Sequence, residues 1–299
     1  MVIKLSLIKS VKTMKHYKNR LDFSPKIIKY SLVIFYYFGF FILSSIILKT
    51  QQPYCTRNLQ TPHTNSIVVT GDNKKKMQEY DDLAVELRQR AARLAGDTQF
   101  WIGLAGGPGS GKSTLAEALR ARLGELLTII PLDGYHYYRS ELDGMDDPEE
   151  AHARRGAPFT FNAAKFVDDL IKARDTGAGA FPSFDHHAGD PVEADIQLTK
   201  GPQIVLVEGN YLLLDTEPWR QLRARVFDET WFLDVPVPEC NRRVGERHVK
   251  TGLSEVQAQL RVATNDSLNA ELVTKMSPGN ADRIIQIPGT SGRLAGPNA

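Results

Sequence analysis

Residues 106–114 form a glycine-rich segment, GGPGSGKST, whose residue types and spacing suit the binding of phosphate groups. The segment satisfies the pattern G-x-x-x-x-G-K-[ST], which is typical of a loop that holds nucleotide phosphates. Glycines let backbone N–H groups turn toward the phosphates, and the positive end of the following helix adds to the attraction. Lys112 is expected to contact the outer phosphates, and the Ser113 hydroxyl is expected to bind magnesium. The predicted nucleotide-binding residues are Gly106, Gly107, Pro108, Gly109, Ser110, Gly111, Lys112, Ser113 and Thr114.

Three apolar runs elsewhere in the chain end in a carboxylate: LLTIIPLD at Asp133, QIVLVE at Glu208 and TWFLD at Asp234. The carboxyl ends of parallel strands share one edge of a sheet, and ligands bind there. We therefore expect Asp133 and Glu208 to face the phosphate loop across one crevice. A carboxylate at the end of a buried strand is costly unless a cation or a donor satisfies it, so magnesium and a substrate hydroxyl are natural partners. Asp234 is instead expected to cap the helix that begins near Pro236 or Pro238.

The sequence on either side of the loop predicts the strands and helices that position these residues. FWIGLAG is apolar and strand-like, and it leads directly into the glycines. STLAEALRARL places Leu115, Leu119 and Leu123 on one stripe of a helix. LVTKMSPGNADRIIQI is expected to supply a last strand. The sequence therefore predicts one α/β domain over residues 77–299, in which a parallel sheet carries helices on both faces.

Charge and cysteine content limit the classes of partner. Residues 1–76 carry 11 Lys and 2 Arg against two aspartates, whereas residues 77–299 carry 24 basic and 33 acidic residues. The larger part is mildly acidic and has no overall bias toward nucleic acid or an anionic membrane. Cys55 and Cys240 are the only cysteines, which excludes a disulfide framework and fits a reducing compartment.

The first 76 residues pose a separate question. YSLVIFYYFGFFILSSIIL, residues 30–48, has no charge and is long enough to cross a bilayer. The positive-inside rule would then place the phosphate loop on the far side of the membrane, where ATP is scarce. Residues 1–76 contain no alanine, whereas residues 77–299 contain 25, and an amphipathic helix is expected to begin at Met77. Three interpretations stay open: translation that really starts at Met77, a membrane anchor, and an organelle-targeting segment. TPHTNSIVVTGDNKKK is a polar linker in each.

The motifs that the sequence lacks limit the classes of nucleotide-binding protein to which it can belong. No base-reading Asn-Lys-x-Asp motif follows the loop, and no LSGGQ-like transporter signature is present. A small kinase needs only the loop, a base, a metal carboxylate, an acceptor pocket and a lid. The hypothesis is therefore a small-molecule kinase, and its alternatives are an ATPase without an acceptor and a degenerate nucleotide-binding module.

Five motifs then occur in a fixed order: GGPGSGKST, LDGYHYY, RRGAPFTFNAAKFVDDL, FPSFDHHAGDP and VLVEGNYLLLD. They resemble the phosphoribulokinase, uridine kinase and pantothenate kinase superfamily of P-loop kinases, nearest to its nucleoside- or sugar-kinase-like branch. The likeness covers about residues 97–288. It implies a three-layer P-loop fold with a small lid, the cofactors ATP and Mg²⁺, and transfer of the γ-phosphoryl group to an alcohol. The acceptor would be a sugar, a nucleoside or a pantothenate-like molecule.

The same resemblance implies roles for individual residues. Asp133 matches the base for the acceptor hydroxyl, and Glu208 matches the glutamate near the metal. Arg243 and Arg247 are four residues apart on one helical face and match lid arginines that close over the phosphates. Arg242 is expected to face solvent. The alternatives are a turn cap at Asp133, a strand-end hydrogen bond at Glu208 and a solvated basic face for the arginines.

The acceptor side of the site rests on the resemblance alone. Tyr135, His136, Arg155 and the pair at residues 186–187 lie in the segments where the family binds its acceptor. FDHHAGDP departs from the pattern of relatives, and ordinary hydrogen-bonding histidines are the alternative for that pair. The predicted substrate-binding residues are Asp133, Tyr135, His136, Arg155 and His186.

The predicted partners are ATP and a small hydroxyl-bearing substrate, without nucleic acid. A membrane contact is expected only if residues 30–48 are an anchor. The expected location is cytoplasmic, and a homodimer is left open.

Overall fold

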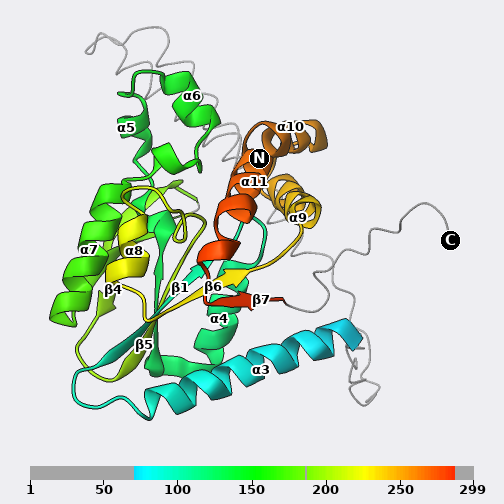
Figure 1. Cartoon of the computed structure of the whole chain (residues 1–299). Helices are drawn as coiled ribbons and strands as arrows, with labels where there is room; N and C mark the ends of the chain where they lie inside the picture. Colours follow the sequence, from blue (N-terminus) through cyan, green and yellow to red (C-terminus); the bar gives the residue numbers. More distant parts are fainter. Residues whose placement is uncertain (1–70, 186, 287–299) are drawn as a thin grey trace, which may run out of the picture. The chain divides into compact units, whose positions relative to one another are not determined.

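The computed structural model of the protein describes residues 71–185 and 187–286 (Figure 1). These residues all belong to the second of the two units into which the chain divides, Ile67–Ala299. Within the described residues, no helix combines the length and the apolar character that a membrane crossing requires. The predicted span at residues 30–48 lies outside the described residues.

A five-stranded sheet forms the centre of this unit, and every strand pairs in parallel with its neighbour. The spatial order is β2 (Leu127–Pro131), β5 (Gln203–Gly209), β1 (Gln99–Ala105), β6 (Glu229–Leu233) and β7 (Arg283–Ile285). These are the strands that the apolar runs predict, including the last one. The parallel order brings their carboxyl ends to one edge.

Both faces of the sheet are buried, which explains why β5 is an uninterrupted apolar run. Val205 and Val207 belong to the hydrophobic cluster on one face, whereas Ile204 and Leu206 belong to the cluster on the other. Side chains alternate between the faces of a strand, so a strand that is covered twice needs apolar residues at every position. Glu208 is the first charged residue of the run and is reached only where the strand meets the phosphate loop.

One face is covered by α3 (Gly71–Ala91) and α4 (Lys112–Leu123). Leu115, Leu119 and Leu123 are buried on α4, as the stripe predicts. The expectation that the first helix begins at Met77 is wrong, because α3 begins six residues earlier, at Gly71. The preceding lysines extend the helix because they are good helix formers and are not followed by a breaker.

The opposite face is covered by α7 (Ala163–Thr176), α8 (Arg220–Arg225) and part of α11 (Ser267–Met276), which contribute Phe166, Leu222 and Val273 to its core. A separate antiparallel hairpin joins β3 (Gly179–Asp185) to β4 (Asp190–Leu198). The predicted α/β architecture, with helices on both faces of a parallel sheet, is therefore confirmed.

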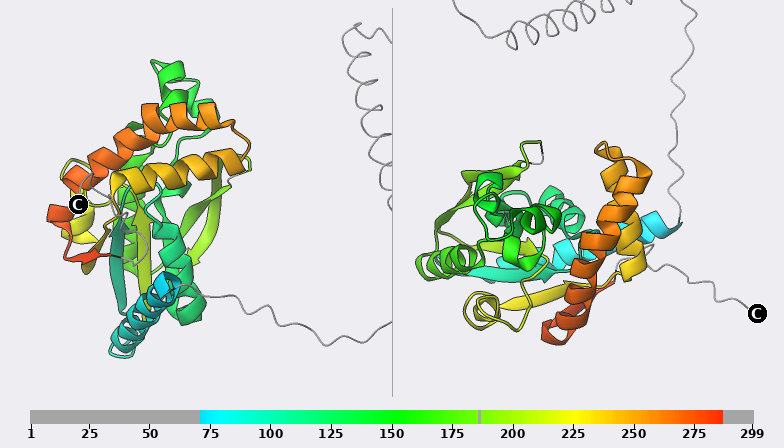
Figure 2. Two further views of the ribbon diagram at one scale, coloured as in Figure 1. Left: turned by 90° about the vertical axis from the view of Figure 1, so that its right-hand side faces the viewer. Right: turned by 90° about the horizontal axis from the view of Figure 1, so that it is seen from above.

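A helical layer lies beyond the carboxyl edge of the sheet, where a lid is expected (Figure 2). It consists of α9 (Val237–Lys250), α10 (Glu255–Arg261) and α11, and both α10 and α11 pack against α9. The remaining short helices are η1 (Gly124–Leu126), η2 (Leu132–Tyr135), α5 (Arg139–Leu142), α6 (Pro148–Ala153), η3 (Pro158–Thr160), the π-helical η4 (Val262–Asp266) and η5 (Pro278–Asn280). The layer places the face of α9 that carries arginines beside the phosphate loop.

Candidate active site

The phosphate loop connects β1 to α4, and its backbone requires glycine at two positions. Gly109 has φ 81° and Gly111 has φ 100°, a region that other residues adopt only with strain. A side chain at Gly109 would also collide with the carbonyl oxygen of Cys240 on α9. Gly106 and Gly107 do not line the pocket but shape the loop from behind, because a Cβ at Gly106 would come within 2.7 Å of Ser110 Oγ.

Lys112 is the first residue of α4 and is buried, with 8% of its surface exposed. Its ammonium Nζ donates to the carbonyl oxygen of Gly107 at 3.2 Å and to Asn210 Oδ1 at 2.8 Å. Burial lowers the pKa of Lys112, while the carboxylates of Glu208 and Asp133 oppose that shift. The amine is thus held in a fixed place by neutral acceptors, without a salt bridge that an incoming phosphate would have to break.

Glu208 ends β5 beside the loop and is 9% exposed. Its Oε1 accepts a hydrogen bond of 2.8 Å from Ser113 Oγ. Burial raises the pKa of Glu208, and the ammonium of Lys112 opposes that shift. A hydroxyl and a carboxylate side by side are oxygen donors of the kind that magnesium takes together with phosphates and water. The pair therefore fits a magnesium ion.

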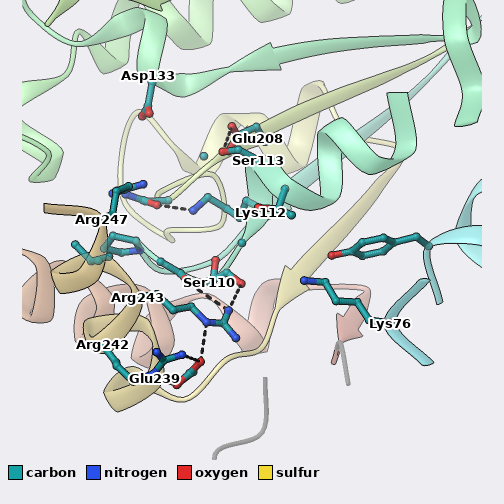
Figure 3. A pocket seen from close by; sticks show the side chains of 18 residues that line it. Lys76, Ser110, Lys112, Ser113, Asp133, Glu208, Glu239, Arg242, Arg243 and Arg247 are labelled. Carbon is teal, nitrogen blue, oxygen red and sulfur yellow. Dashed lines mark hydrogen bonds and ion pairs between the residues drawn. The ribbon is translucent and has the colours of Figure 1, made fainter. Parts of the chain in front are cut away.

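A pocket of about 470 Å³ opens in front of the loop (Figure 3). Its wall combines the loop, the ends of β2 and β5, one face of α9 and the start of α3. The charged side chains of this wall are Lys76, Lys112, Asp133, Glu208, Glu239, Arg242, Arg243 and Arg247. Five are basic and three are acidic, so the pocket favours an anion. The expectation that Asp133 and Glu208 face the loop in one crevice is confirmed.

Asp133 lies in the short helix η2, directly after β2, and points into the pocket (Figure 3). Its backbone carbonyl accepts a hydrogen bond from the His136 amide at 3.2 Å. Its carboxylate makes no hydrogen bond or ion pair with the described residues, and η2 has no side-chain cap. The geometry gives no support to the turn-capping alternative and leaves the carboxylate facing the loop.

The arginines of α9 occupy three different environments. Arg243 Nε donates to Glu239 Oε1 at 2.7 Å, and its Nη1 reaches the carbonyl oxygens of Gly109 and Ser110 at 3.4 and 3.3 Å. Arg247 is exposed at the rim of the pocket and has no hydrogen bond or ion pair to any described residue. Arg242 faces solvent, as predicted, because 55% of its side chain is exposed in ion pairs with Glu239 and Glu246.

Tyr135 and His136 lie outside the wall of the pocket. Tyr135 is 2% exposed, and its hydroxyl donates to Asp169 Oδ2 at 2.9 Å within the core beside α7. Burial raises the pKa of that hydroxyl. The His136 ring contacts the rings of Phe161 and Phe184 in tilted arrangements, with centroids 4.0 and 5.0 Å away. The structure therefore does not bring Tyr135 to the pocket.

Arg155 is turned into the protein. Its two terminal nitrogens donate to the carbonyl oxygens of Gly189 and Tyr137 at 2.5 and 2.9 Å, and Nη2 also reaches Asp190 Oδ1 at 3.1 Å. These bonds tie the loop after α6 to the β3–β4 hairpin. Most of the guanidinium donors predicted to face a substrate are thus used within the chain. His186 lies outside the described residues, and its neighbour His187 is exposed.

Asp234 does not cap α9, contrary to the prediction. The helix begins after Pro236 without a side-chain cap, and Asp234 Oδ2 instead accepts a hydrogen bond of 2.9 Å from Gln286 Nε2. Proline at the first positions supplies the backbone angle that starts the helix, so a capping carboxylate is not needed.

Sequence reasoning missed three contributors to the pocket. Asn210 holds the Lys112 ammonium, and its position two residues after Glu208 was the available signal. Glu239 pairs with Arg243 four residues later, a spacing that indicates an ion pair on a helix. Hydrogen bonds from Arg242 and Arg243 lower the pKa of Glu239 to about 2. Lys76 comes from a stretch that reads as a polar linker, and no signal marked it.

Comparison with known proteins agrees with this geometry. Residues 101–230 match the Phosphoribulokinase / Uridine kinase family. A uridine kinase-like protein of Schizosaccharomyces pombe is 43% identical over 212 residues, which cover 67% of this chain and 87% of that relative.

Two solved structures share the fold. A protein of Silicibacter sp. TM1040, named as a fructose transport system kinase, has a TM-score of 0.58 at 31% identity and covers 68% of this chain and 98% of its own. YFH7 of Saccharomyces cerevisiae, a P-loop containing kinase with a circular permutation, has a TM-score of 0.60 at 21% identity and covers 70% and 98%. The phosphate loop, the carboxylates opposite it and these similarities lead to one conclusion: the chain is a P-loop kinase and belongs to the phosphoribulokinase/uridine kinase family.

Proposed function

We propose that this kinase transfers the γ-phosphoryl group of ATP to an alcohol group of a small molecule, in the class of sugars, nucleosides and pantothenate-like compounds. One observation carries the proposal: a single pocket is lined by the phosphate loop, the Ser113–Glu208 pair and the Asp133 carboxylate. A phosphate cradle, a metal-type donor pair and a carboxylate without a partner among the described residues are what transfer to a hydroxyl requires. The names of a uridine kinase-like relative and a fructose transport system kinase support this acceptor class.

The donor side would be held by the loop. Backbone N–H groups of residues 109–114 would bind the phosphates, with Lys112 at the outer ones. Ser113 and Glu208 would hold Mg²⁺, which would neutralise charge on the phosphates when bound. Because ATP is the donor, we place the domain in the cytoplasm.

The acceptor side would depend on Asp133. Its carboxylate would accept the proton of the acceptor hydroxyl, and Arg243 and Arg247 would stabilise the charge that develops on the phosphoryl group. Tyr135 and Arg155 would act through the shape of the acceptor segments, since their polar atoms bind Asp169, Gly189 and Tyr137. His136 and His186 are kept as candidates for direct contact with the acceptor.

An ATP-consumption assay over a panel of acceptors tests the proposal. The full chain is incubated with Mg²⁺, ATP and one of several nucleosides, hexoses and pentoses, pantothenate or glycerate, and the products are separated by mass. We expect one class of acceptor to raise the rate of ADP release. The mass of that acceptor should increase by ~80 Da, which corresponds to one phosphoryl group. ADP release that no acceptor changes would favour the ATPase alternative, and nucleotide binding without turnover would favour the binding module.

Arg247→Ala is expected to lower the transfer rate by about tenfold to a hundredfold, with less effect on ATP affinity. Arg247 lines the pocket without a partner among the described residues, so its guanidinium is available to the transferring group. Lys250→Ala is the control for the loss of one positive charge, because Lys250 is exposed on the same helix and does not line the pocket. The transfer rates of both variants are measured by steady-state kinetics. If the Arg247→Ala variant transfers as fast as the control variant, Arg247 has no role in the site.

Asn210→Ala is expected to lower transfer by about tenfold, the worth of one hydrogen bond to a charged group. Its Oδ1 atom accepts from Lys112 Nζ at 2.8 Å and keeps the amine on the pocket side. The carbonyl of Gly107 remains as a second acceptor, so the amine is misplaced rather than lost. Kinetics alongside thermal unfolding test this, and an unchanged rate would show that Gly107 alone positions Lys112.

A further inference from the structure

One cation of the pocket belongs to no motif. Lys76 lies on the first part of α3 and lines the pocket together with Tyr80, one helical turn further on. Figure 3 shows the Lys76 side chain directed into the pocket, on the side away from Arg247. Its neighbours Lys74 and Lys75 are exposed, whereas Lys76 is half-buried. The first turns of α3 therefore present one selected lysine to the nucleotide site.

The position of Lys76 is determined by the packing of α3. Tyr80, Leu83 and Leu87 belong to the hydrophobic cluster that α3 shares with α4 and β1. The Tyr80 ring is 3% exposed, with the Arg122 guanidinium 5.6 Å from its centroid. Arg122 also binds Asp81 at 2.6 Å. A helix anchored by its core face and by these contacts to α4 holds the Lys76 backbone in place beside the loop.

The Lys76 ammonium has no ion-pair partner among the residues that the structure describes. It lies 5.7 Å from the Tyr80 ring centroid and forms no hydrogen bond with the described residues. The acidic residue of α9 that lines the same pocket, Glu239, is already paired with Arg242 and Arg243. Burial and the Arg243 guanidinium both lower the pKa of Lys76. Lys76 and Arg243 both line this pocket (Figure 3), so an anion bound between them would interact favourably with both.

We propose that Lys76 is a nucleotide-binding residue, and that its ammonium binds the phosphate chain of ATP and ADP from the α3 side of the loop. This inference rests on the proposed function, which makes a nucleotide the ligand of the pocket. It adds a second lysine to the site, supplied by α3 and not by the loop. A protein that began at Met77 would lack this lysine and the first turns of the helix that positions it.

Calorimetry of ADP and ATP binding to the full chain tests the proposal. Lys76→Ala is expected to lower the affinity for both nucleotides by about tenfold, because a charge-assisted contact to phosphate is lost. Lys75→Ala is the matched control: it removes the same charge from the adjacent, exposed position and is expected to bind as the unchanged protein does. Lys76→Arg keeps the positive charge and is expected to retain most of the affinity.

The outcomes separate this inference from the function on which it rests. If the unchanged protein binds ADP and ATP but Lys76→Ala matches Lys75→Ala, Lys76 has no role and only this inference is overturned. If the unchanged protein binds neither nucleotide, the proposed function is overturned and this inference with it. Thermal unfolding is measured for each variant. If Lys76→Ala unfolds at a lower temperature than the wild-type protein, nucleotide binding is compared for Lys76→Gln instead. Glutamine keeps most of the length of the side chain without its charge.

Discussion

Replacing Lys112 by alanine is expected to reduce phosphoryl transfer by about 10³-fold or more while the domain stays folded. Lys112 is the one basic residue of the loop sequence GGPGSGKST, and hydrogen bonds to Gly107 and Asn210 hold its ammonium at the pocket. No water or side chain that enters the space left by alanine can supply a fixed positive charge at the outer phosphates. The loss should therefore exceed the effect of removing a partly exposed cation such as Arg247.

Stability should change far less than activity. A buried ammonium without a salt bridge costs desolvation energy, which its two hydrogen bonds only partly offset. Alanine also favours the first turn of α4. The variant also leaves Asn210 Oδ1 without its donor and removes a cation that favours the buried Glu208 carboxylate, so the terms oppose one another. We expect the melting temperature of Lys112→Ala to stay close to that of the wild-type protein. A folded variant that has lost turnover would show that the amine serves the ligand and not the fold.

Arg120→Ala provides the control for Lys112→Ala. Arg120 is on the same helix and is exposed, so its loss removes an equal charge from α4 outside the pocket. Turnover by Arg120→Ala should stay within about twofold of the unchanged protein, as for most surface substitutions. Normal turnover by a folded Lys112→Ala protein would refute the assignment of the phosphate loop.

The sheet and the centre of the pocket could be predicted because both follow from local patterns. The apolar run of β5 stops at Glu208, and that of β2 stops just before Asp133. The end of each strand can therefore be predicted from its own residues. Parallel pairing then brings both ends to the loop without further information. Glycine at positions 109 and 111 is equally local, because it is required by the backbone of the loop itself.

The acceptor segments could not be predicted because their contacts are long-range and involve backbone atoms. Arg155 binds the carbonyl oxygens of Gly189 and Tyr137, and a carbonyl acceptor leaves no trace in residue types. Tyr135 finds Asp169, a partner 34 residues away that is fixed only once α7 packs on the sheet. A family resemblance marks such segments but does not say which way a side chain turns.

The first helix illustrates a different limit. The compositional break at Met77 does not mark the start of the helix, since the lysines before it belong to α3, which begins at Gly71. Lys76 reads as one of three equivalent lysines until the packing of Tyr80 selects it for the pocket. Helix rotation, and hence the choice among neighbouring lysines, is decided by tertiary packing.

Asp133→Asn is expected to separate nucleotide binding from chemistry. The substitution keeps the size of the side chain and its ability to meet a hydroxyl, but the amide cannot accept the acceptor's proton. Loss of a general base costs about 10²- to 10⁴-fold in rate. ATP affinity should change little, because the phosphates would be held by the loop and by Lys112, and Asp133 makes no hydrogen bond to either.

The turn-capping alternative makes the opposite prediction, because asparagine caps about as well as aspartate and activity would survive. Transfer to the acceptor found in the panel is therefore measured together with ATP affinity by calorimetry. Asp175→Asn, at an exposed position of α7, is the control for the loss of one carboxylate. Transfer near the unchanged rate would remove Asp133 as the base. Loss of ATP binding together with transfer would place its carboxylate among the nucleotide or metal ligands, beside Ser113 and Glu208.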